Sequence, residues 1–117
     1  MSDPIMHDVT WDTGTASHVM TSTANSDTIE VGFSNHIVFQ LTWGNGQNGF
    51  LWLEASLDKT NWAKDHNSAV KIAGADTVIF NQQNTSIPFY RVHYEFSNQA
   101  GSPTLTGKFY RKPLGKG

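Results

Sequence analysis

The chain has 117 residues, which suits a single domain, and it contains no cysteine. The absence of cysteine excludes a disulfide framework and any thiolate metal site. Only 15% of the residues are charged, whereas serine, threonine, asparagine and glutamine together supply 36 residues. This composition is typical of short strands joined by turns, and its neutral polar groups are less costly to desolvate at a protein contact than charged ones.

The formal net charge of −2 is divided unevenly along the chain. Residues 1–58 contain no lysine or arginine and have a net charge of −7, whereas residues 59–117 carry all eight basic residues and a net charge of +5. Either the two halves form adjacent strands that neutralise each other, or an acidic arm reaches a basic surface on a neighbouring copy. No dense basic patch with interleaved aromatic residues is present, so a nucleic-acid partner is not expected.

Residues 1–12 contain three acidic residues, no basic residue and no apolar run, so they lack the pattern of a secretory signal peptide. No apolar stretch approaches the roughly 20 residues that a membrane-spanning helix needs. The sequence therefore predicts neither signal-peptide export nor a membrane partner.

The N-terminal elements are only weakly patterned. Short strands are predicted over residues 5–11, 17–23 and 28–33. Apolar residues are few before Ile29, so residues 1–28 are predicted to form an N-terminal arm, which could be extended, or peripheral strands of the domain.

The strongest pattern follows. Residues 36–43 and 50–57 each show a period of two, which is the period of a strand that can be buried on one face. The sets that share a face are Ile37, Phe39, Leu41 and Trp43 in the first segment and Leu51, Leu53, Ala55 and Leu57 in the second. The six residues 44–49 are rich in glycine and asparagine, which tolerate turn conformations. We therefore expect a β-hairpin with a long exposed loop.

Four further strands complete the pattern. An edge strand is predicted over residues 69–73, and others over 75–80, 87–96 and 104–110. The basic, glycine-containing residues 111–117 are predicted to be a flexible tail.

No helix is predicted. Short strands separated by turns indicate an all-β fold, namely a single antiparallel β-sandwich over residues 29–110 with Greek-key or jelly-roll-like connections. The predicted core consists of Ile37, Phe39, Leu41, Leu51, Leu53, Trp62, Val78, Tyr90, Val92, Tyr94, Leu105 and Phe109.

A structural turn is predicted after the strand over residues 50–57. The carboxylate of Asp58 can accept hydrogen bonds from turn amides, and Ser56 and Asn61 suit the same turn. Trp62 is expected to fold back and anchor the turn on the core.

Phe50 and Trp52 lie on the face of their strand opposite Leu51 and Leu53. Two explanations remain open. The strand is covered on both sides, or the two rings form a rigid platform for a partner.

The pattern over residues 36–110 resembles small β-sandwich structural proteins of tailed bacteriophages. The resemblance rests on a strand ending in Thr42-Trp43, the turn from Ser56 to Trp62, the run Phe-Tyr-Arg-Val-His-Tyr at residues 89–94, and the closing segment from residue 101. It implies a virion protein made in the host cytoplasm, with capsid or tail proteins and copies of itself as partners.

Within that class, a capsid decoration (cement) protein is the first expectation, and a tail or baseplate component is the alternative. A carbohydrate-binding or host-adhesion module is a further alternative, with Trp43, Trp52 or the loop 44–49 as its platform.

The candidate interface residues follow from charge and aromatic character. The acidic N-terminal residues and the basic C-terminal residues are expected to contribute to assembly, and closed symmetry suggests a trimer first. The full set is Asp3, Asp8, Asp12, Phe50, Trp52, Lys108, Arg111 and Lys112.

Catalytic and metal-binding patterns are not found. The five histidines do not pair at metal-ligand spacings, and no nucleophile elbow or phosphate-binding loop is present. Glu54 and Glu95 are assigned to outward strand positions. We expect no enzyme activity, no metal and no cofactor.

Overall fold

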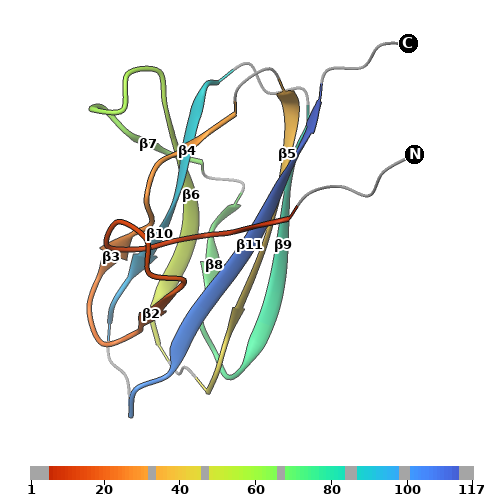
Figure 1. The fold of residues 1–117 in the computed structure, drawn as a ribbon. Helices are drawn as coiled ribbons and strands as arrows, with labels where there is room; N and C mark the ends of the chain where they lie inside the picture. The colour runs from red at the N-terminus through yellow and green to blue at the C-terminus, as the bar shows by residue number, and fades with distance from the viewer. Residues whose placement is uncertain are drawn as a thin grey trace.

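The computed structural model describes residues 6–31, 34–45, 48–65, 68–83, 87–97 and 101–113. The described residues form eleven strands, arranged as two antiparallel sheets that face one another, and no α-helix (Figure 1). The predicted antiparallel β-sandwich is therefore confirmed.

The first sheet has the strand order β1-β11-β5-β9, and β2 also pairs with β11. Its strands are β1 (His7–Asp8), β2 (Ser17–Val19), β5 (Ser34–Trp43), β9 (Asp76–Gln83) and β11 (Thr104–Pro113).

The second sheet has the strand order β3-β10-β6-β7, with β4 also on β10 and β8 also on β6. Its strands are β3 (Ala24–Asn25), β4 (Ile29–Glu30), β6 (Phe50–Ser56), β7 (Ala63–Lys64), β8 (Val70–Lys71) and β10 (Phe89–Glu95).

The expected hairpin over residues 36–57 is wrong. β5 pairs with β11 and β9, whereas β6 pairs with β10, so the loop at residues 44–49 crosses from one sheet to the other. Both strands carry a buried apolar face, and packing those faces against each other across the sandwich removes more apolar surface from water than pairing their edges does.

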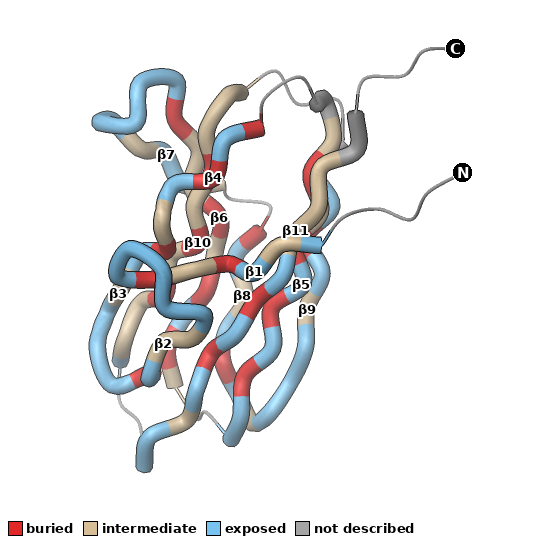
Figure 2. Tube along the Cα trace, in the orientation of Figure 1, coloured by how far each residue is buried: buried red, intermediate tan, exposed pale blue. Residues whose placement is uncertain are grey.

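The core lies between the sheets and follows the predicted alternation, which Figure 2 shows as buried and exposed positions in turn along β5 and β11. Burying one such aliphatic or aromatic side chain contributes about 1.5–3 kcal/mol. The buried apolar residues are Val9, Trp11, Met20, Ile29, Val31, Ile37, Phe39, Leu41, Trp43, Leu51, Leu53, Ile72, Phe80, Tyr90, Val92, Tyr94 and Leu105.

Three predicted core residues are not fully buried. Val78 and Phe109 are half-buried and pack against the cluster from its margin. Trp62 does not anchor the turn in the core, because its ring lies 4.3 Å from the guanidinium of Arg91 on the outside of the second sheet.

The N-terminal segment contributes to the core, although its pattern predicted little burial. Val9, Trp11 and Met20 are at most 1% exposed. These residues lie beside strands that are only two or three residues long, so no period-two pattern could develop in the sequence. β1 and β2 pair with β11, and β3 and β4 pair with β10, so the segment spans both sheets.

The C-terminal strand is longer than expected. Arg111 and Lys112, placed in the predicted flexible tail, continue β11 and pair with Ile37 and His36 of β5. Residues 114–117 lie outside the described residues.

Candidate interaction surfaces

The turn after β6 is organised by Asp58. Its Oδ1 accepts hydrogen bonds from the amides of Thr60 (2.9 Å) and Asn61 (2.8 Å) and from Ser56 Oγ (2.9 Å). These bonds hold the pKa of the Asp58 carboxyl well below its usual range. The indole of Trp62 donates to the carbonyl of Lys59 at 3.1 Å, so the tryptophan closes the turn on itself.

An aromatic face covers the outside of the second sheet, and we define it by Phe50, Trp52, Trp62, Phe89 and Arg91. Trp52 stacks on His93 with ring centroids 4.6 Å apart, and Lys64 Nζ lies 4.1 Å above the same indole ring. Phe50 is 43% exposed at one end of the face.

Ion pairs hold the centre of this face. Arg91 forms an ion pair with one oxygen of Glu54, with its Nε and Nη2 at 2.8 and 2.7 Å from Oε1. Partial burial raises the pKa of Glu54, but hydrogen bonds from Trp52 and Arg91 outweigh it and the pKa lies below its usual value. His93 contacts Glu95 Oε1 at 2.8 Å. Both outward glutamates are therefore engaged in structural bonds.

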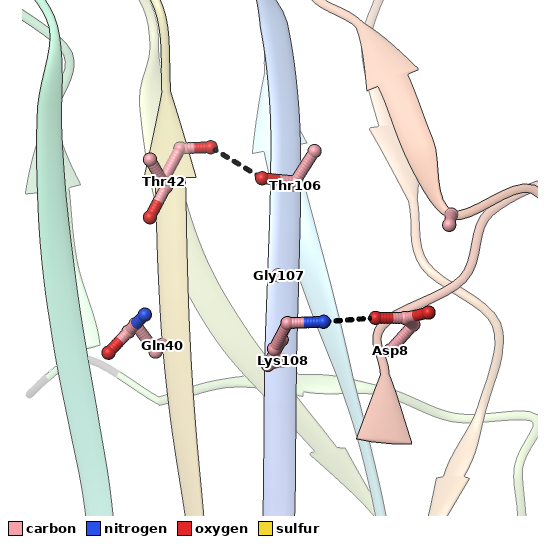
Figure 3. A pocket seen from close by; sticks show the side chains of 7 residues that line it. Asp8, Gln40, Thr42, Thr106, Gly107 and Lys108 are labelled. Carbon is pink, nitrogen blue, oxygen red and sulfur yellow. Dashed lines mark hydrogen bonds and ion pairs between the residues drawn. The ribbon is translucent and has the colours of Figure 1, made fainter. Parts of the chain in front are cut away.

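A threonine face covers the outside of the first sheet, and we define it by Thr42, Thr77, Thr106, Gln40 and Lys108. The register aligns Thr106, Thr42 and Thr77 in one row across three strands, with Thr42 and Thr77 hydroxyls 3.1 Å apart. A hollow of about 410 Å³ lies on this face. Figure 3 shows Lys108 and Asp8 pointing toward one another among its lining residues, and they form an ion pair of 2.6 Å.

The predicted interface residues are scattered rather than gathered. Phe50 and Trp52 share the aromatic face, whereas Asp8 and Lys108 pair with each other on the threonine face. Arg111 donates to the carbonyl of Glu30 at 2.7 Å.

The remaining acidic and basic candidates have separate places. Asp12 is exposed in a turn held by Asp27, whose carboxylate accepts from the amides of Thr13 and Gly14 at 3.0 and 2.9 Å. Asp3 and the side chain of Lys112 lie outside the described part of the chain.

Sequence patterning could not find the cation–aromatic contacts. Lys64 reaches Trp52 because β7 pairs with β6, which sets Lys64 opposite Glu54. Arg91 on β10 reaches Trp62 at the end of the Asp58 turn. These contacts join strands that are distant or irregular in the sequence, so only the three-dimensional register reveals them.

Among the described residues, no group of three or more histidine, aspartate or glutamate side chains could hold a metal ion. In that same part of the chain, no helix has the length and apolar character to span a membrane.

Comparison with protein-family models and with curated proteins finds no match for this sequence. Solved structures do match its fold. The SPBc2 prophage-derived protein YomS aligns with a TM-score of 0.56 and 12% identity over 96% of this chain and 97% of YomS. The PBSX exported protein XepA aligns with a TM-score of 0.64 and 16% identity over 95% of this chain, which spans 38% of XepA.

A further match comes from the Bacillus endospore appendages, described as disulfide-linked pili, with a TM-score of 0.53 and 10% identity over 97% of this chain and 87% of that one. At these identities the matches define the fold. The resemblance to small phage-derived β-sandwich proteins is thus confirmed at the level of the fold.

Proposed function

We propose that this chain is a structural protein of a bacteriophage virion, and specifically a capsid decoration protein that binds and stabilises the head. The observation that carries the proposal is the likeness in fold to a prophage-derived protein over almost the full length of both chains. In this role the chain works through its surfaces, without catalysis, a cofactor or nucleic acid, and its localisation is the virion.

The aromatic face is the surface proposed to contact the capsid. Aromatic and arginine side chains contribute most of the binding energy at many protein interfaces. Here the cations of Lys64 and Arg91 already rest on the rings of Trp52 and Trp62. Because these long side chains are ordered before binding, less conformational entropy is lost when a partner covers them.

Repetition on a capsid lattice supports the mechanism. One contact through this face would be modest, because Phe50 is the large apolar side chain that it exposes most. Several linked contacts per assembled unit raise the effective concentration, so weak single contacts become tight together.

The carbohydrate-binding alternative receives less support from the tryptophans that would form its platform. Trp43 is 3% exposed and donates its indole N–H to the carbonyl of Gly74 at 2.7 Å. Trp52 is covered by His93 and Lys64. Neither ring presents a free face to a sugar.

The test is cosedimentation of the purified full chain with heads and with tails of the phage that encodes it, followed by electron microscopy of the complexes. We expect binding to heads, and Phe50→Ser is expected to weaken it about tenfold or more, the range of an interface anchor. Leu57→Ser is the matched control, because Leu57 is 75% exposed on the Asp58 turn and outside the aromatic face.

Binding to tails alone would replace decoration by the tail or baseplate role. Failure to bind either part of the particle would overturn the virion proposal, and a glycan array would then test the carbohydrate-binding alternative.

A further inference from the structure

β9 is the outer strand of the first sheet, with β5 as its neighbour. It pairs with β5 over eight consecutive residues without a register shift. Its sequence, Asp-Thr-Val-Ile-Phe-Asn-Gln-Gln, contains no proline, lysine or arginine. Natural edge strands are usually short, bulged or marked by such residues, because an open edge pairs with other strands. The β9 edge has none of these protections.

The hydrogen bonds at the other side of the sheet identify which backbone groups face outward. In β11, the C=O of the odd residue Gly107 accepts from Val9 N–H at 2.8 Å, on the side away from β5. The C=O of the even residue Thr104 accepts from Gly44 N–H, directly after β5, at 3.2 Å. Bonding direction alternates along an antiparallel strand. In the register between β11 and β5, the backbone N–H and C=O groups of the odd residues of β5 therefore point towards β9. In the register between β5 and β9, those of the even residues of β9 point towards β5.

The N–H and C=O groups of Thr77, Ile79 and Asn81 therefore point away from the sheet. An independent contact agrees with this direction: Thr77 N–H donates to the carboxylate of its own neighbour Asp76 at 2.8 Å. No strand of the described residues pairs with this edge. The edge thus offers a row of backbone acceptors together with the donors of Ile79 and Asn81, whereas the Thr77 N–H is bound to Asp76.

At the centre of this row of backbone groups, β9 also carries an exposed apolar side chain. Ile79 is 62% exposed on the outside of the sheet. It borders a hollow of about 240 Å³ that Met6, Val38 and Tyr110 also line. Ile79 therefore carries an apolar surface to the very edge of the molecule.

We propose that β9 is the contact through which two copies of this chain pair, as antiparallel edge strands related by a two-fold axis at Ile79. An antiparallel register centred on Ile79 places each outward-bonding residue opposite another, Thr77 facing Asn81 of the second copy. The Ile79 pair exchanges both N–H···O bonds, and each Thr77–Asn81 pair does so once the Thr77 N–H leaves the Asp76 carboxylate. The two first sheets become one continuous sheet.

The charges of β9 favour a second copy as the occupant. Asp76 is its one charged residue, and this register sets it opposite the neutral Gln82. The two Asp76 carboxylates lie about six residues, or ~20 Å, apart along the strands, well beyond the ~8 Å screening length. Lys108 is two strands inside the edge and paired with Asp8. The contact therefore creates no like-charge juxtaposition.

The inference does not depend on capsid binding, which uses the opposite sheet. It also differs from the trimer expected from symmetry preference alone, since an edge of this kind joins two copies.

The first test is analytical ultracentrifugation of the full chain over a wide concentration range. We expect a monomer–dimer equilibrium, with Ile79→Lys raising the dimer Kd about tenfold or more because two ammonium groups would face each other at the axis. Val19→Lys is the matched control, because Val19 is also apolar and 48% exposed but lies on β2.

A second variant separates backbone pairing from side-chain packing. Ile79→Pro removes an N–H that points away from β5, so the fold is expected to persist, as checked by circular dichroism, while the dimer is lost. Phe80→Pro would instead remove a bond to β5 and is not informative about pairing.

Oxidation tests the register directly, because the chain has no cysteine of its own. Ile79→Cys is expected to form a disulfide-linked dimer, since opposed residues of a hydrogen-bonded pair have Cα atoms about 5.5 Å apart. Thr77→Cys alone is expected to remain uncrosslinked.

A monomer at all concentrations, or a trimer unaffected by Ile79→Lys and Ile79→Pro, would overturn the proposal. So would a monomer whose Ile79→Pro variant loses binding to a phage protein, because a different partner would then occupy the edge.

Discussion

At the residue scale, Asp58 shows how one exposed side chain can define a turn. Its carboxylate accepts both neighbouring turn amides, and a methyl group at this position would accept none. We expect Asp58→Ala to lower the melting temperature at neutral pH. Asp58→Asn, which retains one acceptor oxygen, should have a smaller effect.

The same residue predicts a pH dependence. The folded pKa of Asp58 lies below its model-compound value of 3.8, so its contribution is complete above that value and is lost as the pH falls through the lower folded pKa. The difference in melting temperature between wild type and Asp58→Ala should therefore shrink on acidification below about pH 4. A difference that stayed constant down to pH 2 would contradict this account.

Gly107 is a second position where one atom matters. A Cβ at Gly107 would lie 2.5 Å from Leu41 Cδ2 and 3.1 Å from Val9 Cγ2 in the core. Gly107→Ala is expected to destabilise the fold by about 1–3 kcal/mol, the usual cost of overpacking. Urea denaturation measures this, with Gly44→Ala as the control, because the nearest atom to a Cβ there is 3.9 Å away.

At the element scale, the N-terminal strands are part of the sandwich. Removing residues 1–28 would delete Val9, Trp11 and Met20 from the core, and truncating even one such side chain costs about 2–5 kcal/mol. We expect the 29–117 fragment to lack a cooperative thermal transition. A cooperatively folding fragment would show that the N-terminal segment is dispensable.

The alternation of side chains predicted which faces of the long strands are buried, because burial of one face is written into the local pattern. Ile37, Phe39 and Leu41 on β5, and Tyr90 and Val92 on β10, are buried as expected. Pairing is not local information. Nothing in residues 36–57 distinguishes a hairpin from two strands in opposite sheets, and that prediction failed.

At the scale of the whole molecule, the uneven charge is neutralised within one chain wherever ion pairs join the halves. Asp8 pairs with Lys108, and Glu54 pairs with Arg91, so each couples an acidic-half residue to a basic-half one. The sequence left open whether the two halves neutralise each other within one chain or an acidic arm reaches a neighbouring copy, because the distribution of charge along the chain does not show which strands pair. The described interface candidates that depended on charge alone therefore form no single patch: Asp8 and Lys108 pair on the threonine face, whereas Asp12 lies in an exposed turn. The aromatic pair stays together on β6.

The two edges of the first sheet have opposite characters. The chain enters this sheet at β1, which pairs with β11 at one side, and β9 forms the other side. Although β1 is three strands from β9 in the pairing order, Met6, directly ahead of β1, lines the same hollow as Ile79. A fluorophore or affinity handle attached just ahead of β1 would therefore lie close to the open edge, and its effect on pairing would report on that contact.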